Sequence, residues 1–243
     1  PVSNPTRARA PQLYVIDRMV ESGFISEDQA QVARAEQLHL RERNNPDRLH
    51  AEYVAEMARQ LIYAQYGDET YTRGLEVYTS INSADQAVAY QALRSGIMDY
   101  ERKQFYRGPE KFIDLPKNPE ELDEAVDDAL AEHPDNGDVL AAVVTSASPK
   151  EVVAVRGNGE TIRIEGDGLR PARSGLAAKA QPKVRIQPGA VIRVARTNKN
   201  AWEITQLPEV EGAFVAMDPR DGAIKALVGG FDFGKNKFNH VTQ

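Results

Sequence analysis

The sequence has no cysteine among its 243 residues and a single tryptophan. The lack of cysteine excludes disulfide bonds and thiolate metal sites, and it is compatible with an oxidising compartment such as the periplasm and with the cytosol. No apolar run approaches the roughly 20 residues that a membrane span needs, and no signal-peptide pattern opens the chain. These two absences predict a chain that is soluble as given, and they leave open an anchor upstream of Pro1.

The composition is 41% hydrophobic and 27% charged, which is typical of a globular protein with one or two domains. The net charge of −6 conceals an uneven distribution of acidic and basic residues along the sequence. Residues 110–138 contain 11 acidic and 2 basic side chains, whereas residues 151–200 contain 10 basic and 4 acidic ones. Such blocks predict solvated faces of adjacent elements. Docking of the two blocks on each other, or a charged partner for the basic block, are the alternatives.

Apolar residues at helical spacing predict helices in the first hundred residues. Residues 1 to about 45 are expected to be helical, with a capping box at Ser26 and an end at Asn44-Asn45-Pro46. A second helix is expected over Leu49–Tyr66.

A third predicted helix starts at Asn82 or Ser83 and ends near Arg102, with Val88, Ala92, Leu93 and Ile97 toward the core. Between the second and third helices, Gly74 to Ile81 alternates apolar and polar residues, which predicts a strand.

The second half changes from a helical to a strand period. Asn118-Pro119 begins a predicted helix with Leu122, Val126 and Leu130 on its inner face. Short β-branched segments separated by turn residues then predict five strands, at residues 139–145, 151–156, 161–165, 190–195 and 201–205. Gly157-Asn158-Gly159 predicts a hairpin, and residues 166–187 form a long excursion. This pattern favours a small five-stranded barrel of the OB type.

The last stretch predicts a β-hairpin. Its strands are expected at Ala213–Met217 and Ala223–Val228, joined by a turn at Asp218–Gly222. An isolated hairpin is marginal in water, so we interpret this one as the opening of a larger, truncated domain. The expected fold class is therefore α+β: an N-terminal helical part, an OB-like barrel and a C-terminal hairpin.

Both ends of the chain resemble a known family. The opening NPTRARAPQLYVIDRMVESGFISEDQAQVARAE and the closing GAFVAMDPRDGAIKALVGGFDFGKNKFNHVTQ resemble class A penicillin-binding proteins, and among them type 1A. The resemblance implies an internal fragment with four parts. These are the last helices of the glycosyltransferase domain (1–45), a linker or pedestal (46–115), an OB-like domain (116–208) and the start of a truncated transpeptidase domain (209–243).

The family's catalytic motifs are missing from this stretch. No Ser or Cys is followed by Lys three residues later, so the S-x-x-K nucleophile is absent, and so is K-T-G. Ser80-Ile81-Asn82 matches S-x-N by chance, with Asn82 as a helix cap. The resemblance implies that the parent protein polymerises lipid II and cross-links peptidoglycan by serine acyl transfer. The fragment is expected to be inactive, with no catalytic residue and no cofactor.

Metal and nucleic-acid sites are not favoured by the sequence. The four histidines, His39, His50, His133 and His240, are scattered without ligand spacing. The acidic helix carries Asp123, Glu124, Asp127 and Asp128 without a calcium-loop pattern, and a solvated face is expected instead. An independent OB-type interaction or nucleic-acid-binding module is the alternative function. Trp202 is the only large aromatic residue of the barrel, and it is expected in the core or at the rim.

The long excursion is the candidate partner-docking site. Arg170, Arg173, Lys179, Lys183 and Arg185 lie on it among Ser, Gly and Pro residues, so it is either flexible or a docking surface. The resemblance implies an outer-membrane lipoprotein activator, or another cell-wall protein, as the partner of this region. It also implies a periplasmic location, attached to the inner membrane in the full-length protein. A plain spacer remains the other interpretation.

Overall fold

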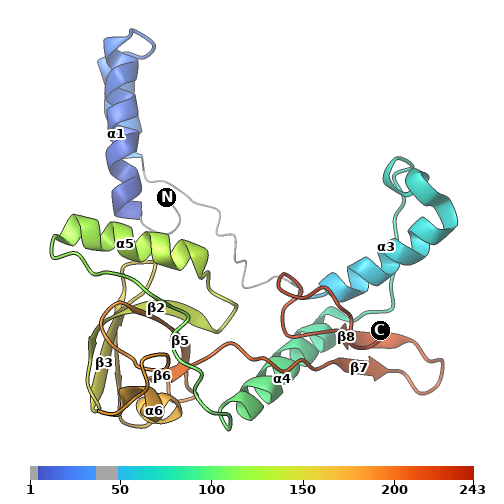
Figure 1. Cartoon of the computed structure of the whole chain (residues 1–243). Coiled ribbons are helices and arrows are strands. Elements are labelled where there is room, and N and C mark those ends of the chain that lie inside the picture. Colours follow the sequence, from blue (N-terminus) through green and yellow to red (C-terminus); the bar gives the residue numbers. More distant parts are fainter. Residues whose placement is uncertain (1–4, 37–48) are drawn as a thin grey trace. The chain divides into compact units, whose positions relative to one another are not determined.

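The computed structural model describes residues 5–36 and 49–243 (Figure 1). The chain divides into two compact units. Of the described residues, the first unit, here the sheet unit, takes 5–36 and 106–205, and the second, here the hairpin unit, takes 49–105 and 206–243. The architecture is mixed helix and antiparallel sheet, so the predicted α+β class is confirmed. In the described ranges no helix is long and apolar enough to cross a membrane.

The chain begins with two helices, α1 (Pro5–Glu21) and α2 (Glu27–Ala35). Ser26 caps α2, and its side chain and main chain both exchange hydrogen bonds with Gln29, so the predicted capping box is confirmed. Arg34 bonds Glu27 and Asp17, which ties α2 to α1. The predicted end at Asn44-Asn45-Pro46 lies outside the described residues.

One antiparallel sheet forms the body of the sheet unit. Its strands run in the order β1-β5-β2-β3-β4, and β6 pairs with β5. The bounds are β1 Lys111–Phe112, β2 Leu140–Ala147, β3 Glu151–Val155, β4 Thr161–Glu165, β5 Ala190–Arg196 and β6 Trp202–Thr205. All five predicted strands are present within two residues of their expected ends, and β1 is an addition. The predicted hairpin at residues 157–159 joins β3 to β4.

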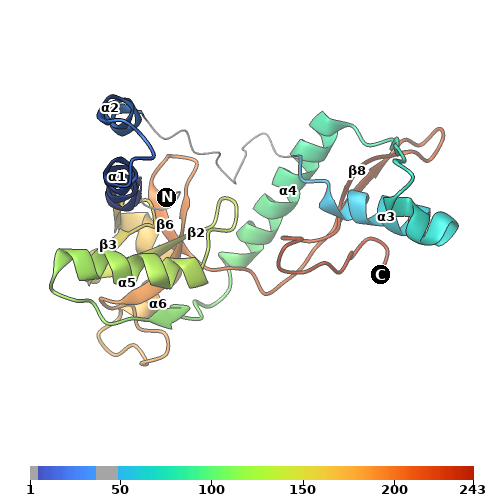
Figure 2. The ribbon, with the colours of Figure 1, turned by 90° about the horizontal axis from the view of Figure 1, so that it is seen from above.

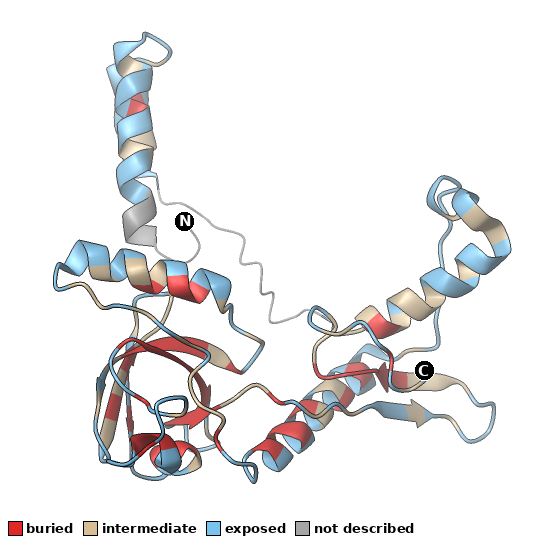
Figure 3. Cartoon of the chain, in the orientation of Figure 1, coloured by how far each residue is buried: buried red, intermediate tan, exposed pale blue. Residues whose placement is uncertain are grey.

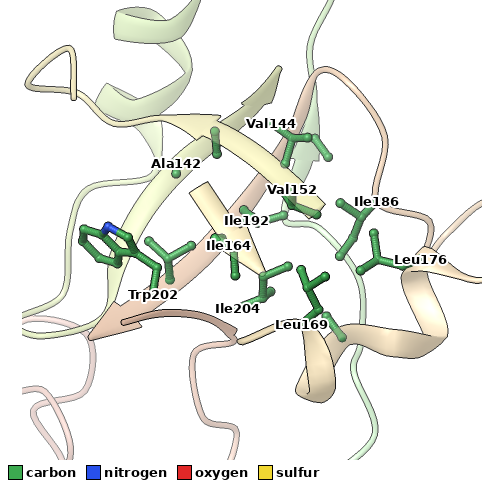
Figure 4. Close-up of a cluster of buried hydrophobic side chains, with 14 of the residues drawn as sticks. Ala142, Val144, Val152, Ile164, Leu169, Leu176, Ile186, Ile192, Trp202 and Ile204 are labelled. Carbon is green, nitrogen blue, oxygen red and sulfur yellow. The ribbon is translucent and has the colours of Figure 1, made fainter. Parts of the chain in front are cut away.

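One face of the sheet packs on a hydrophobic core (Figure 4). Ile164, Ile192 and Ile204 come from three different strands and are at most 1% exposed. The long excursion contributes to this core through a 3-10 helix, η2 (Gly166–Ala172), and a short helix, α6 (Arg173–Leu176). The excursion is therefore built into the unit.

The opposite face of the sheet is covered by α5 (Pro119–Glu132). Asn118 caps this helix, as predicted, by accepting a hydrogen bond from the main chain of Glu120. Val126, Ala129 and Leu130 pack against β2 and β5, and burying this apolar stripe is what holds the helix on the sheet.

The hairpin unit joins two helices to the C-terminal hairpin. Its elements are α3 Glu52–Tyr66, the 3-10 helix η1 Gly67–Tyr71, α4 Ser83–Glu101, β7 Phe214–Met217 and β8 Ile224–Val228. The predicted hairpin is confirmed, and β8 lies along α4 (Figure 2). Tyr53 from α3 donates a hydrogen bond to the carbonyl oxygen of Asn236, 2.7 Å away. Burial raises the pKa of Tyr53 to about 12, so its hydroxyl stays protonated.

Two predictions in this unit failed, the second only in part. Residues 74–81 are extended but pair with no other strand among the described residues, so the predicted strand does not form. On α4, Ile97 is buried and Leu93 packs against the core as predicted, but Val88 is 66% exposed and Ala92 is exposed. The polar side chains of Gln86 and Arg94 are buried in their place. Hydrophobic periodicity alone could not identify buried polar residues as the inner face.

Candidate docking surface

The residues that match transpeptidase motifs have structural roles. Asn82 accepts hydrogen bonds from the main chains of Ala84 and Asp85 and so caps α4, as predicted. Ser80 donates through its hydroxyl to the carbonyl oxygen of Ile224, 2.7 Å away. The hydrogen bonds described for both side chains go to main-chain groups of the hairpin unit.

The histidines are dispersed in the structure as they are in the sequence. His50 stacks on Tyr90 at a ring separation of 3.7 Å, His133 bonds Glu110, and His240 contacts Phe238. His39 lies outside the described residues. Within residues 5–36 and 49–243, no three His, Asp or Glu side chains gather as a metal site would require.

The acidic helix presents its carboxylates mainly outward. Asp123, Glu124 and Asp128 are exposed, and Asp127 is half-buried. At its C-terminal end Glu132 pairs with Lys111, and this ammonium group lowers the pKa of Glu132. The outward carboxylates match the solvated face that the sequence predicted. The Glu132–Lys111 pair links α5 to β1.

An ion pair connects the same helix end to the sheet. Arg193 of β5 is 4% exposed and bonds both carboxylate oxygens of Glu110, at 2.8 and 2.7 Å. It also donates to the carbonyl oxygen of Pro134, directly after α5. Burial raises the pKa of Glu110, but Arg193 and His133 outweigh burial and hold it below its ordinary value. These partners are far apart in the sequence, so periodicity gave no sign of the pair.

Trp202 is the aromatic residue that the sequence singled out. It is 9% exposed and belongs to the core, so the prediction of a core or rim position is confirmed. The guanidinium groups of Arg156 and Arg196 lie over its ring, 5.6 and 3.8 Å from the centroid. Glu160 pairs with both arginines. The ring is thus covered by protein and offers no stacking platform for a base.

The long excursion is an ordered loop. Ile186 donates its main-chain N–H to the carbonyl oxygen of Gly175, which closes the segment on itself. Leu169, Ala172 and Leu176 are buried in the core of the sheet unit. A loop that places apolar side chains in the core holds its exposed side chains on a fixed support.

The loop carries five basic side chains, and we call this set the basic loop: Arg170, Arg173, Lys179, Lys183 and Arg185. All five are exposed. Figure 3 colours the chain by burial, with exposed residues in pale blue. None forms an ion pair with any described residue, and Arg185 makes one hydrogen bond, to the carbonyl oxygen of Ala180. The sequence from Gly168 to Trp202 holds no acidic residue that could neutralise them.

By contrast, the arginines on the strands of this unit form ion pairs. Arg163 pairs with Glu151, Arg193 with Glu110, and Glu160 serves both Arg156 and Arg196. The basic loop thus brings five cations without a described ion pair into one segment, whereas Lys150 and Lys199 lie apart from it in the sequence. Such a surface attracts an anionic partner.

A second surface was not predicted. In the hairpin unit, the extended residues 75–81 and α3 line an apolar groove with a volume of about 630 Å³. The alternation of Leu75, Val77, Thr79 and Ile81 was visible in the sequence, but the lack of a partner strand was not.

The comparisons with known proteins agree on one family. Residues 106–210 match the penicillin-binding protein OB-like domain. The whole chain is 36% identical to penicillin-binding protein 1A of Neisseria lactamica and 35% identical to that of Escherichia coli strain K12. It covers 30% and 29% of those proteins.

A solved structure agrees with these matches. The crystal structure of penicillin-binding protein 1A from Haemophilus influenzae superposes on 98% of this chain, with a TM-score of 0.68 and 25% identity. The chain covers 34% of that structure. The chain spans about a third of the length of the relatives it matches, and over that length it is similar to penicillin-binding protein 1A, with an OB-like domain of the penicillin-binding proteins at residues 106–210.

Proposed function

We propose that residues 1–243 form the non-catalytic linker and OB-like region of a longer, bifunctional cell-wall synthase, which we call the parent protein. The parent polymerises lipid II and cross-links peptidoglycan by serine acyl transfer. It works in the periplasm, attached to the inner membrane. The single observation that carries this proposal is the family match over the whole chain, in a region without S-x-x-K and K-T-G motifs.

The region spaces and orients the two catalytic domains of the parent. This role needs rigid units, and buried polar contacts between distant segments support it. In the sheet unit, the Glu110–Arg193 pair fixes the segment before β1 to β5 and to the end of α5. In the hairpin unit, Gln86 and Tyr53 fix α4 and α3 to residues near the C-terminus. We propose domain boundaries at about 45, 115 and 208. The compact units divide instead at residues 105/106 and 205/206, so Glu110 and β1 lie in the sheet unit.

The basic loop docks a regulator of the parent. Its partner is an outer-membrane lipoprotein activator or another cell-wall protein with an acidic face. The unpaired cations favour an anionic partner, and the ordered backbone presents them without a large ordering cost on binding. The ring of Trp202 is covered by Arg156 and Arg196, and Phe112 is the single exposed aromatic residue on the described strands of this unit. Without a row of stacking aromatic residues, a nucleic-acid partner is not favoured.

The docking role is tested in cells that depend on the parent protein. A variant with all five cations of the basic loop changed to Ala is expected to accumulate normally and react with penicillin normally. It should support cell-wall synthesis at a clearly lower rate than the wild type. The control changes Lys150 and Lys199, which are exposed lysines of the same unit, to Ala. Equal growth of the loop variant and the control would contradict docking at the basic loop.

A further inference from the structure

Residues Leu75–Ile81 form an extended segment whose main chain is unpaired. In the part of the chain that the structure describes, no main-chain hydrogen bond is made by residues 74–81. The segment is anchored only where it reaches β8: the Ser80 hydroxyl bonds Ile224, and the next main-chain bond runs from Asn82 to Lys225. A strand with open N–H and C=O groups is a template for pairing with another strand.

The side chains of this segment have two distinct faces. Leu75, Val77, Thr79 and Ile81 line the groove, and Val54, Ala58 and Ile62 of α3 line its other wall. Leu75 is 39% and Val77 48% exposed, so the groove leaves branched apolar side chains in water. Tyr78 is 88% exposed, and its hydroxyl bonds Glu76, so the second face of the segment is polar.

Among the described residues that line the groove, Arg59 is the cation, and it is paired. Arg59 donates to both carboxylate oxygens of Glu56 and to the hydroxyl of Tyr71. The hydrogen bonds from Arg59 and Gln60 lower the pKa of Glu56 to about 2. The groove therefore offers an occupant apolar surface and free main-chain groups, with no charge to recognise. That combination fits a strand added at a sheet edge, with its side chains alternating into the groove.

We propose that this groove receives a β-strand with apolar residues at alternate positions, supplied by the part of the parent protein outside residues 1–243. The inference rests on the proposal that a longer parent exists. The relatives contain about three times the length of this chain, so the parent has ample sequence to supply one strand. A strand from the same polypeptide also binds at a high effective concentration, which a separate protein lacks. A strand that pairs along the whole of Leu75–Ile81 needs about seven residues, because seven extended residues span roughly 23 Å.

The test uses two cysteine variants in a chain that has no native cysteine. Val77→Cys places a thiol in the groove, and Tyr78→Cys places one on the exposed face as the matched control. Each variant is made in the full-length parent and in residues 1–243, and its maleimide labelling rate is followed by mass spectrometry of the peptide. We expect Val77→Cys to react at least ten-fold more slowly in the parent than in residues 1–243, and Tyr78→Cys to react equally in both.

Amide hydrogen exchange on the same proteins reports the main chain. Alternate amides of residues 75–79 are expected to be at least ten-fold more protected in the full-length parent. Equal labelling of Val77→Cys in both proteins would overturn the proposal. Thiol protection without amide protection would overturn it too, because the groove would then be covered without a strand. Slow labelling in residues 1–243 that disappears on dilution would point to a second copy instead. If penicillin labels the parent but the Val77→Cys thiol stays reactive in it, the strand proposal fails while the proposed function of the parent stands.

Discussion

The side-chain amide of Gln86 in α4 bonds both main-chain groups of Leu227 in β8. Its nitrogen donates to the Leu227 carbonyl oxygen, and its oxygen accepts from the Leu227 N–H, each at 2.8 Å. The same nitrogen donates to the carbonyl oxygen of His50, 2.6 Å away. Gln86 is fully buried, so one side chain takes the place of a neighbouring strand at this edge of β8.

Gln86→Leu should destabilise the hairpin unit strongly. The substitution keeps an apolar volume but leaves buried main-chain groups of Leu227 without partners, which costs about 2–4 kcal/mol. The measurement is the free energy of unfolding in urea. Gln91→Leu, on the exposed face of the same helix, is the matched control and should change it by less than about 0.5 kcal/mol. Equal effects would show that the Gln86 contacts do not stabilise the unit.

Glu110→Gln should destabilise the sheet unit because it leaves Arg193 charged and buried without its carboxylate. Removing one partner of a buried pair costs about 3–5 kcal/mol, and the 26% exposure of the Glu110 side chain places the expected loss at the lower end. Glu151→Gln, which breaks the exposed pair with Arg163, is the control and should cost less than about 1 kcal/mol. Unfolding in urea measures both, and a loss no larger than that of the control would count against the buried pair.

The same pair predicts a pH dependence. The pKa of Glu110 is lowered in the folded protein, so its contribution is fully present above the ordinary value of 4.5 and is lost as pH falls through the lowered value. The stability difference between wild type and Glu110→Gln should therefore shrink as pH falls from 6 to 3. Urea unfolding across this range measures the difference directly. A difference that stays constant would rule out linkage to Glu110.

Gly168→Ala should disrupt the packing of the basic loop on the sheet. A Cβ atom at this position would lie well inside 3.0 Å of the Trp202 carbonyl oxygen, which is main chain and cannot move aside cheaply. We expect a loss of about 2 kcal/mol or more from this overpacking. Gly157→Ala is the matched control, because its nearest contact is a Leu130 methyl group at 3.7 Å. Comparable melting temperatures for the two variants would show that the loop tolerates a shift.

Local signals allowed much of the fold to be predicted from sequence. Ser26, Asn82 and Asn118 cap their helices where expected, because capping depends on residues two or three positions away. Strands β3 and β4 alternate buried and less buried residues, and this two-residue period can be recognised in the local sequence. The face of α4 was mispredicted because its buried side chains include Gln86 and Arg94, whose partners lie about 140 residues further along the chain.

The candidate docking site could also be predicted only in part. The five cations of the basic loop were identified from the sequence, because they lie close together along the chain. Their lack of ion pairs and the burial of Leu169 and Leu176 beneath them depend on the tertiary fold. The strand predicted at residues 74–81 failed for a related reason, since alternation specifies a face but a ladder also requires a partner.

Penicillin labelling distinguishes a linker region from a transpeptidase. A fluorescent penicillin acylates a transpeptidase serine, and residues 1–243 contain no S-x-x-K motif to supply one. We expect no covalent label on residues 1–243 and stoichiometric label on the full-length parent protein. Label on residues 1–243, or a full-length parent that remains unlabelled, would show that residues 1–243 are not the non-catalytic region of such a synthase.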